Sequence, residues 1–348
     1  MRCSMANIRG PANRLLLNGV CVLLSAHFAI AYNTLTTPMV SFEPAKELNG
    51  RGGVFAYRML PAILWKACVF LLHPVHARFP GLHLPALNKP FDSNEAWFMV
   101  LLTFCAMLGT LLVARRLLSA IVGADGQHGR WGFEWMALGM GYAAYFDSAL
   151  VLKRNLFYPY DVLALFFFML LVYLAFMGRP LAFTAILVPA MLNKETAIVS
   201  VLVYFGLRYR PGQRKRLVAL CGCMAAAAIA VRLLQTAYIH RICPACIGMP
   251  QNQLSLNLHQ LTNPLFWLSE ASVFGFAYVA TILFWRYVPG QVRLTVLAVC
   301  GLWIAMMAMT GVLREVRIFS ELSALVLLVV GLGVHGWLEE RRNLRLVA

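Results

Sequence analysis

The segment from Lys153 to Arg210 decides the fold, and it reads KRNLFYPYDVLALFFFMLLVYLAFMGRPLAFTAILVPAMLNKETAIVSVLVYFGLRYR. Three apolar runs fill it, separated by two polar breaks. The first break carries a single charge, Arg179, and the second is the tight turn NKET at 193–196. Charges at the ends of apolar runs need partners, because an unsatisfied polar group is costly in a bilayer. We therefore expect the YPYD motif at 158–161 and the NKET turn to face the same side of a membrane and to line one polar cleft.

The composition places the chain in a membrane. Hydrophobic residues make up 61% of the 348 residues and charged residues only 13%, which excludes an ordinary soluble protein. The net charge of +16 would suit a nucleic-acid partner in a soluble chain. In a membrane protein it is typical of basic cytoplasmic loops and of contact with anionic lipid headgroups. We expect membrane lipids as partners and no nucleic acid.

Apolar runs recur along the whole chain and predict an all-α polytopic protein with one integral membrane domain over residues 1–348. A crossing of about 30 Å needs about 20 residues at 1.5 Å each, and two of the ten crossings that we expect are much shorter. Short helices are tolerated where they border a watered cavity within the protein. The expected crossings cover residues 15–32, 96–114, 131–152, 162–177, 180–192, 197–207, 217–239, 264–285, 294–313 and 320–337.

Residues 33–95 form the exception, an outer loop that includes the apolar run 54–72. Arg58, Pro61 and Lys66 interrupt this run. If it crossed, the next crossing would carry Arg115 and Arg116 to the outer side, against the preference of basic residues for the cytoplasm. We therefore predict an interfacial or re-entrant helix on the outer face. Both termini are then cytoplasmic, and a bacterial inner membrane is the expected location.

Three carboxylates on the outer side are candidate catalytic groups: Glu43, Asp161 and Glu195. Asp161 stands at the start of a helix, where an acid also favours the helix dipole. Glu195 could cap a short helix or pair with Lys194. A carboxylate at the mouth of a partly desolvated cleft could instead act as a general base toward a hydroxyl group.

Several cations are expected on the same face. The segment REVRIFSE at 314–321 places Arg314, Arg317 and Glu321 on one side if it is helical. It is either a solvated interfacial turn or a guanidinium clamp for a phosphate, a task that suits arginine through bidentate hydrogen bonds. Arg58 and Lys194 complete the candidate set of phosphate-binding residues.

Charges within the expected crossings are few. Asp147, Arg232 and Glu270 lie five to seven residues from the outer ends of their crossings, and we predict a structural ion pair between Arg232 and Glu270. Cys243 and Cys246 fall in an outer loop, as free thiols or as a disulfide. The cysteines and histidines form no metal-binding pattern, so no metal is expected, and the sequence leaves any cofactor unknown.

Four short motifs carry a resemblance to a known class of enzymes. They are FAYRMLP at 55–61, YPYD at 158–161, NKET at 193–196 and REVRIFSE at 314–321. Together they resemble uncharacterised bacterial multi-span membrane proteins, which are similar to the GT-C class of glycosyltransferases.

The resemblance implies an activity. Members of the GT-C class transfer a sugar from a polyprenyl-phosphate carrier on the outer face, typically with an acidic residue of the first outer loop as base. Glu43 or Glu47 would have to fill that position here, and Asn33 stands directly after the first crossing, where many members carry Asp. The donor phosphate is the leaving group, so Arg58, Arg314 and Arg317 would neutralise the charge that builds up on it. The implied partner is a lipid-linked sugar or another isoprenoid phosphate.

Two other classes of function remain open. A transporter or flippase for an anionic lipid or solute would also use half-length helices, although no inverted repeat is evident. A membrane scaffold or assembly partner would need no site at all.

Overall fold

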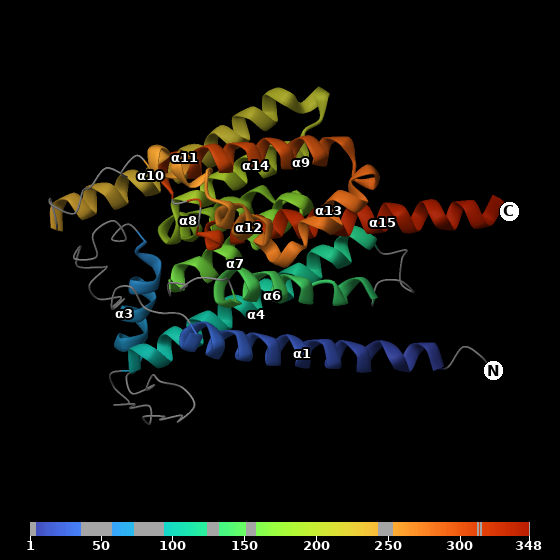
Figure 1. Ribbon diagram of the computed structural model, residues 1–348, viewed down its shortest axis with the longest axis horizontal. Helices are drawn as coiled ribbons and strands as arrows, with labels where there is room; N and C mark the ends of the chain where they lie inside the picture. Colours follow the sequence, from blue (N-terminus) through green and yellow to red (C-terminus); the bar gives the residue numbers. More distant parts are fainter. Residues whose placement is uncertain are drawn as a thin grey trace.

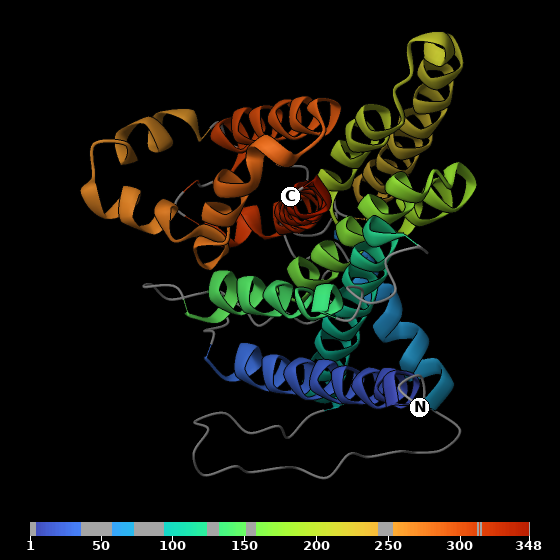
Figure 2. The same ribbon diagram turned by 90° about the vertical axis from the view of Figure 1, so that its right-hand side faces the viewer.

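The computed structural model describes residues 5–35, 58–72, 94–123, 132–150, 158–242, 253–311, 313 and 315–347. All regular structure in this part of the chain is helical, as predicted. The long helices run roughly along one axis, and α15 lies near the middle of the bundle when it is seen end-on (Figures 1 and 2). Short one-turn helices are labelled η. In chain order the elements that matter below are α1 (Met5–Leu35), α3 (Leu60–Leu72), α4 (Asn94–Val122), α6 (Leu138–Tyr145), η3 (Phe146–Leu150), α7 (Pro159–Met177), α8 (Pro180–Asn193), η4 (Glu195–Val199), α9 (Ser200–Arg208), α10 (Arg214–Ile242), α11 (Leu254–Gln260), α12 (Pro264–Ala271), η7 (Val273–Phe276), α13 (Tyr278–Phe284), α14 (Gly290–Thr310), η9 (Val316–Leu322) and α15 (Ser323–Val347).

Within the described residues, six helical segments are long and apolar enough to cross a membrane. They span residues 13–35, 96–122, 160–177, 211–242, 290–310 and 316–344. In the last of these, 72% of the apolar window is buried inside the protein, against 17% in the segment that contains α10. The C-terminal helix is therefore the centre of the bundle, and α10 is a peripheral helix whose apolar side chains are largely exposed.

The other predicted crossings are short or broken. Residues 180–192 form α8, and residues 197–207 fall in η4 and α9. The expected single helix over 131–152 is interrupted by a turn at 136–137, which separates a helical segment at 132–135 from α6 and the π-helical turn η3 that follows it directly. The expected helix over 264–285 is also wrong as one element. Phe274, Gly275 and Phe276 all have positive φ angles (58°, 57° and 66°), a conformation that no right-handed helix can contain.

Helix α3 has the short length that an interfacial helix needs, and its position at a membrane surface stays a prediction. It has 13 residues, so it is about 20 Å long and cannot cross a hydrocarbon layer of about 30 Å. It runs crosswise to α1 at one end of the bundle (Figure 1). Phe70 and Leu71 are 79% and 70% exposed, so the helix has exposed apolar side chains near its C-terminal end.

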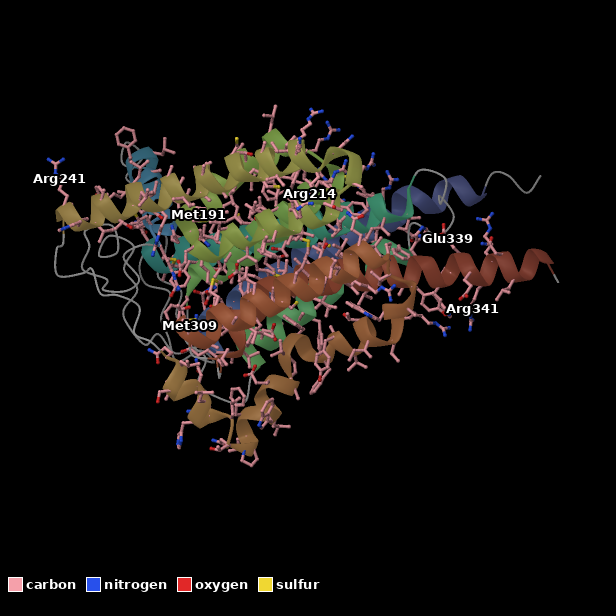
Figure 3. The ribbon with its side chains drawn as sticks, turned by 90° about the horizontal axis from the view of Figure 1, so that it is seen from above. Met191, Arg214, Arg241, Met309, Glu339 and Arg341 are labelled. Atoms are coloured by element: carbon pink, nitrogen blue, oxygen red, sulfur yellow. The ribbon has the colours of Figure 1, made fainter. Side chains whose placement is uncertain are left out.

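The two ends of the bundle are distinct. Helix α1 begins and α15 ends at one end, which we call the terminal end (Figure 1). Arg214, Glu339 and Arg341 lie toward that end, whereas Met191, Arg241 and Met309 lie toward the other (Figure 3). The placement of both termini in the cytoplasm stays a prediction, because the structure shows only that these helix ends share a side.

Candidate functional site

The charged side chains of four segments meet at the end of the bundle opposite the terminal end, and we call this end the network end. Helix α7 begins there, α8 ends there, and η9 leads into α15 there. The chain just before α3 supplies the fourth contribution, Arg58. The sequence expectation that scattered charges converge is therefore correct for Arg58, Asp161, Lys194, Glu195, Arg317 and Glu321.

Asp161 owes its place to the start of α7. Tyr158 is extended (φ −136°, ψ 100°) and Pro159 occupies the first helical position, where its missing N–H costs nothing. Asp161 lies in the first turn, where a carboxylate favours the helix dipole. Its side chain is nevertheless turned inward and only 4% exposed, so it needs cationic partners.

Lys194 is the first of these partners. It separates α8 from η4 with an extended backbone (φ −158°, ψ 133°), which ends the helix and turns its side chain into the protein. Its Nζ atom lies 3.1 Å from Oδ1 of Asp161 and 2.8 Å from Oε1 of Glu321. The lysine side chain is 6% exposed and Glu321 is 1% exposed. One buried ammonium group therefore holds two buried carboxylates from different helices.

The turn η9 closes the network from the C-terminal side. Arg317 donates a hydrogen bond to Oδ2 of Asp161 and another to Glu315. Glu321 accepts a bond from the hydroxyl group of Thr196, at 2.9 Å from Oε2. Both oxygens of Asp161 and both oxygens of Glu321 are thus engaged. This degree of satisfaction is what makes a buried ionic cluster tolerable.

Aromatic rings support the two arginines. The guanidinium carbon of Arg317 lies 4.0 Å from the ring centre of Tyr158, and that of Arg58 lies 4.1 Å from the ring centre of Tyr160. Such cation–π contacts contribute about 0.5–2 kcal/mol each. Tyr32 of α1 fixes the backbone below them, because its hydroxyl accepts from the N–H of Tyr158 and donates to its carbonyl oxygen.

Exposure divides the site into two parts. The inner network consists of Asp161, Lys194, Thr196 and Glu321, all at most 5% exposed. The rim consists of Arg58, Glu195, Glu315 and Arg317, whose side chains are 18%, 45%, 35% and 12% exposed. Arg58 and Glu195 face each other loosely, with 3.8 Å between Nη2 and Oε1. A ligand can therefore reach the rim, whereas the inner network holds the helices that carry it.

The charges of the turn stay fixed over a wide pH range. Partial removal from water raises the pKa of the half-exposed Glu195, but the positive charge of Arg58, a backbone hydrogen bond and the smaller effects of Arg232 and Lys194 outweigh it and leave the pKa below its usual value of 4.5. Burial alone would lower the pKa of Lys194, but Asp161 and Glu321 raise it above 10.5. Both groups are therefore ionised near neutral pH.

Other predictions fare differently. Glu43, Glu47 and Arg314 lie outside the described residues, as do Cys243 and Cys246. The predicted pair of Arg232 with Glu270 is wrong, because no ion pair joins these two described residues. Arg232 acts instead on Glu195 and Glu270 on Asp147, since α10 and α12 lie on different sides of the bundle (Figure 2).

The sequence did not point to several supporting residues. Thr196 was part of the quoted NKET turn, yet its bond to Glu321 joins positions 125 residues apart. The Tyr32 hydroxyl is equally remote from Tyr158 in sequence. Glu315 pairs with Arg317, two residues further along the chain. The sequence alone could not predict this pair, because it depends on the geometry of the turn.

Two further features bear on ligands. Among the described residues, no three His, Cys, Asp or Glu side chains gather as a metal ion would require. A groove of about 480 Å³ between α9 and α14 has an almost wholly apolar lining that includes Phe205, Tyr209 and Leu294. None of its lining residues belongs to the charged network, so it is a separate feature of the bundle.

Comparisons with known proteins add no identity. The chain matches no family model, no curated protein and no solved structure.

Proposed function

We propose that the protein is a membrane glycosyltransferase that takes a sugar from a polyprenyl-phosphate carrier at the network end. The observation that carries the proposal is the rim, where an accessible carboxylate, Glu195, faces Arg58. Arg58 and a second rim arginine, Arg317, are both backed by aromatic rings. Glycosyl transfer from a lipid phosphate needs this combination of a base for the acceptor and cations for the departing phosphate.

The roles follow from exposure. Glu195 takes the proton of an acceptor hydroxyl, whose oxygen then bonds to the anomeric carbon of the sugar. The bond between that carbon and the phosphate oxygen breaks, and the polyprenyl phosphate leaves with the electron pair. Arg58 and Arg317 stabilise the charge that develops on the phosphate. Asp161 and Lys194, which the sequence suggested as base and phosphate ligand, position Arg317 and the NKET turn in this scheme, because their charged atoms are buried and engaged.

The loose pair of Arg58 and Glu195 suits this chemistry. At 3.8 Å it is a weak contact for which a phosphate can compete. When a phosphate draws Arg58 away, Glu195 loses the charge that most depresses its pKa and becomes a better base. Binding of the donor thereby activates the group that deprotonates the acceptor.

The carrier tail has a place beside the rim. Helix α3 follows Arg58 directly and packs on α7 and α8. Its exposed side chains at 63, 64, 67, 69, 70 and 71 are apolar, and Lys66 is the one exposed charge among its described side chains. An isoprenoid chain lying along this helix would bring its phosphate to Arg58.

Sugar transfer in proteoliposomes tests the proposal. Purified protein would be given radiolabelled polyprenyl-phosphate glucose, mannose and galactose in turn, and release of unglycosylated carrier would be measured. Glu195→Gln is expected to slow turnover by about 10²–10⁴-fold, the usual contribution of a general base. Glu339→Gln is the matched control, because Glu339 is 64% exposed at the terminal end. Turnover by the Glu195→Gln variant at the wild-type rate, or no turnover of any donor, would refute the proposal.

A second candidate is a flippase for an anionic lipid. It is favoured by the interrupted elements α8–η4–α9 and α12–η7–α13, since broken helices are typical of transporter sites. Movement of a fluorescent anionic phospholipid across the same vesicles, without covalent change, would support this reading over the first.

A further inference from the structure

The apolar groove between α9 and α14 lies apart from the charged network and opens at the outside of the bundle. Leu202 on one wall and Leu294 on the other are 42% and 70% exposed. The volume of the groove, about 480 Å³, falls within the range of ordinary ligand sites, about 300–1,000 Å³. Because α14 is one of the segments that could cross a membrane, a hydrocarbon chain is the occupant that suits this lining.

The groove has a polar end, which lies toward the terminal end of the bundle. Helix α9 leads away from the network end, and α14 runs back beside it (Figure 1). Gln291, in the first turn of α14, donates hydrogen bonds of 2.6 and 2.8 Å to the carbonyl oxygens of Gly206 and Tyr209 at the end of α9. These bonds join the two helices at the polar end. From there the apolar lining continues as far as Leu202 and Val299.

Two arginines stand directly beside this polar end. Arg210 follows the lining residue Tyr209 and is exposed, and Arg293 precedes the lining residue Leu294. The guanidinium group of Arg293 reaches back toward the start of α14, because a Cβ atom at Gly290 would lie 3.8 Å from its Nη2. Neither arginine forms an ion pair with another described residue. The polar end therefore offers two positive charges that no described carboxylate neutralises.

The surroundings of the groove add to this positive charge. Residues 196–269 and 271–314, which include both walls, contain no Asp or Glu. Arg214, the first residue of α10, also lies toward the terminal end (Figure 3). Arg208 is engaged elsewhere, because a Cβ atom at Gly178 would lie 2.6 Å from its guanidinium carbon. That position is the C-terminal end of α7, where a cation favours the helix dipole.

We propose that the groove between α9 and α14 binds an acyl chain of one anionic phospholipid, whose phosphate lies against Arg210 and Arg293. An apolar groove with a cationic end is complementary to a molecule with a hydrocarbon tail and a negative headgroup. Each Lys or Arg near an anionic membrane surface strengthens attraction about fivefold, so two arginines correspond to about 25-fold. This difference separates an anionic phospholipid from a zwitterionic one with the same tails.

The donor lipid of the proposed glycosyltransferase is a different molecule at a different place. Its phosphate is proposed to lie at the network end, beside Arg58 and Glu195, whereas the cations of the groove lie toward the terminal end. The two lipid phosphates would therefore lie at opposite ends of the bundle. No residue that lines the groove belongs to the rim, so the two proposals can fail separately.

Native mass spectrometry of the purified full-length protein tests the proposal. The protein in detergent would be titrated with phosphatidylglycerol and, separately, with phosphatidylcholine of the same acyl chains. The wild type is expected to bind one molecule of phosphatidylglycerol about 25-fold more tightly than phosphatidylcholine, and the combination of Arg210→Gln with Arg293→Gln is expected to remove this preference. Ala298→Trp is expected to abolish the binding, because Ala298 is an exposed lining residue and an indole ring there would fill the groove.

Two matched controls keep these effects specific. Arg341→Gln combined with Arg342→Gln also removes two exposed charges, but from α15, away from the groove. Ala305→Trp places the same ring on an exposed position of α14, two turns beyond Ala298 and outside the groove. Both controls are expected to bind phosphatidylglycerol as the wild type does.

Four results would overturn the proposal. Equal affinity of the wild type for the two phospholipids would show that the groove selects no anion. Loss of the preference in the control on α15 as well would indicate attraction to a charged surface, and tight binding by Ala298→Trp would leave the groove empty. Tighter binding of a polyprenyl phosphate than of phosphatidylglycerol, abolished by Ala298→Trp, would assign the groove to the donor lipid. If the double variant does not fold, the exposed Arg210 can be replaced alone, and Arg210→Gln is then expected to weaken the binding about fivefold.

Discussion

Replacement of Lys194 by methionine tests the inner network most severely. The substitution keeps the length of the side chain and removes the ammonium group that lies 3.1 Å from Asp161 and 2.8 Å from Glu321. Asp161 retains Arg317, whereas Glu321 retains only the hydroxyl of Thr196. Removing one partner of a buried ion pair costs about 3–5 kcal/mol, and the uncompensated charge of Glu321 places Lys194→Met in that range.

A double-mutant cycle separates this cause from simple loss of packing. In Lys194→Met combined with Glu321→Gln, no uncompensated carboxylate remains, because Asp161 is still paired with Arg317 and the amide can bond to Thr196. We expect the double variant to be more stable than Lys194→Met alone by about 2 kcal/mol or more. Unfolding would be followed by equilibrium titration with a denaturing detergent. Lys66→Met is the matched control, because Lys66 is exposed on α3, and we expect a change within about 0.5 kcal/mol. A cost below about 1 kcal/mol for Lys194→Met, or strictly additive effects in the cycle, would refute the reasoning.

Three further predictions concern other parts of the fold. Thr196→Val should destabilise the protein by about 1.5–3 kcal/mol in the same titration, because Glu321 loses its hydroxyl donor. Thr196→Ser keeps the hydroxyl group and should change the stability little. Equal destabilisation by the two substitutions would contradict this prediction. Because the pKa of Glu195 is lowered, the ionic contribution of Glu195 to stability is lost only as pH falls below 4.5. Because the pKa of Lys194 is raised, the ionic contribution of Lys194 is lost only as pH rises above 10.5. The stability difference between wild type and Glu195→Gln should therefore be flat between those values, and a step near pH 7 would count against the assignment. Gly206→Ala should lower the free energy of unfolding by about 1–3 kcal/mol, because its Cβ would lie 2.1 Å from Oγ1 of Thr295 on α14. Gly222→Ala on α10 is the control, because its Cβ would meet nothing within 4 Å and the change should be neutral or stabilising. Thermal unfolding of the two variants compares them.

The sequence was informative about the network because of where its charges stand. Asp161, Lys194, Arg317 and Glu321 flank or enter apolar runs, and such charges must find partners in the protein. Which partners they choose could not be predicted. Lys194 and Glu195 are neighbours, but the extended backbone at Lys194 sends one side chain inward and leaves the other at the rim.

The broken helices show a second limit. The apolar composition of 264–285 favours one crossing helix, and Gly275 alone is a weak signal against it. The break depends on a hydrogen bond between Phe274 and Asp147, which are 127 residues apart. Pairing Glu270 with Arg232 was wrong for a related reason, because a similar depth along two helices does not make those helices neighbours.

The most direct measurement of the central claim is the depth at which a lipid phosphate meets the bundle. A polyprenyl-phosphate sugar that carries a photoreactive diazirine on its first isoprene unit would be added to the protein in vesicles, and the cross-linked peptides would be identified by mass spectrometry. We predict adducts on α3, around Ile63, and in the NKET turn, both of which adjoin Arg58 and Glu195. Adducts concentrated at the terminal end, for example at the 86% exposed Leu181 of α8, or spread evenly over all lipid-facing helices, would contradict a phosphate-binding rim at the network end.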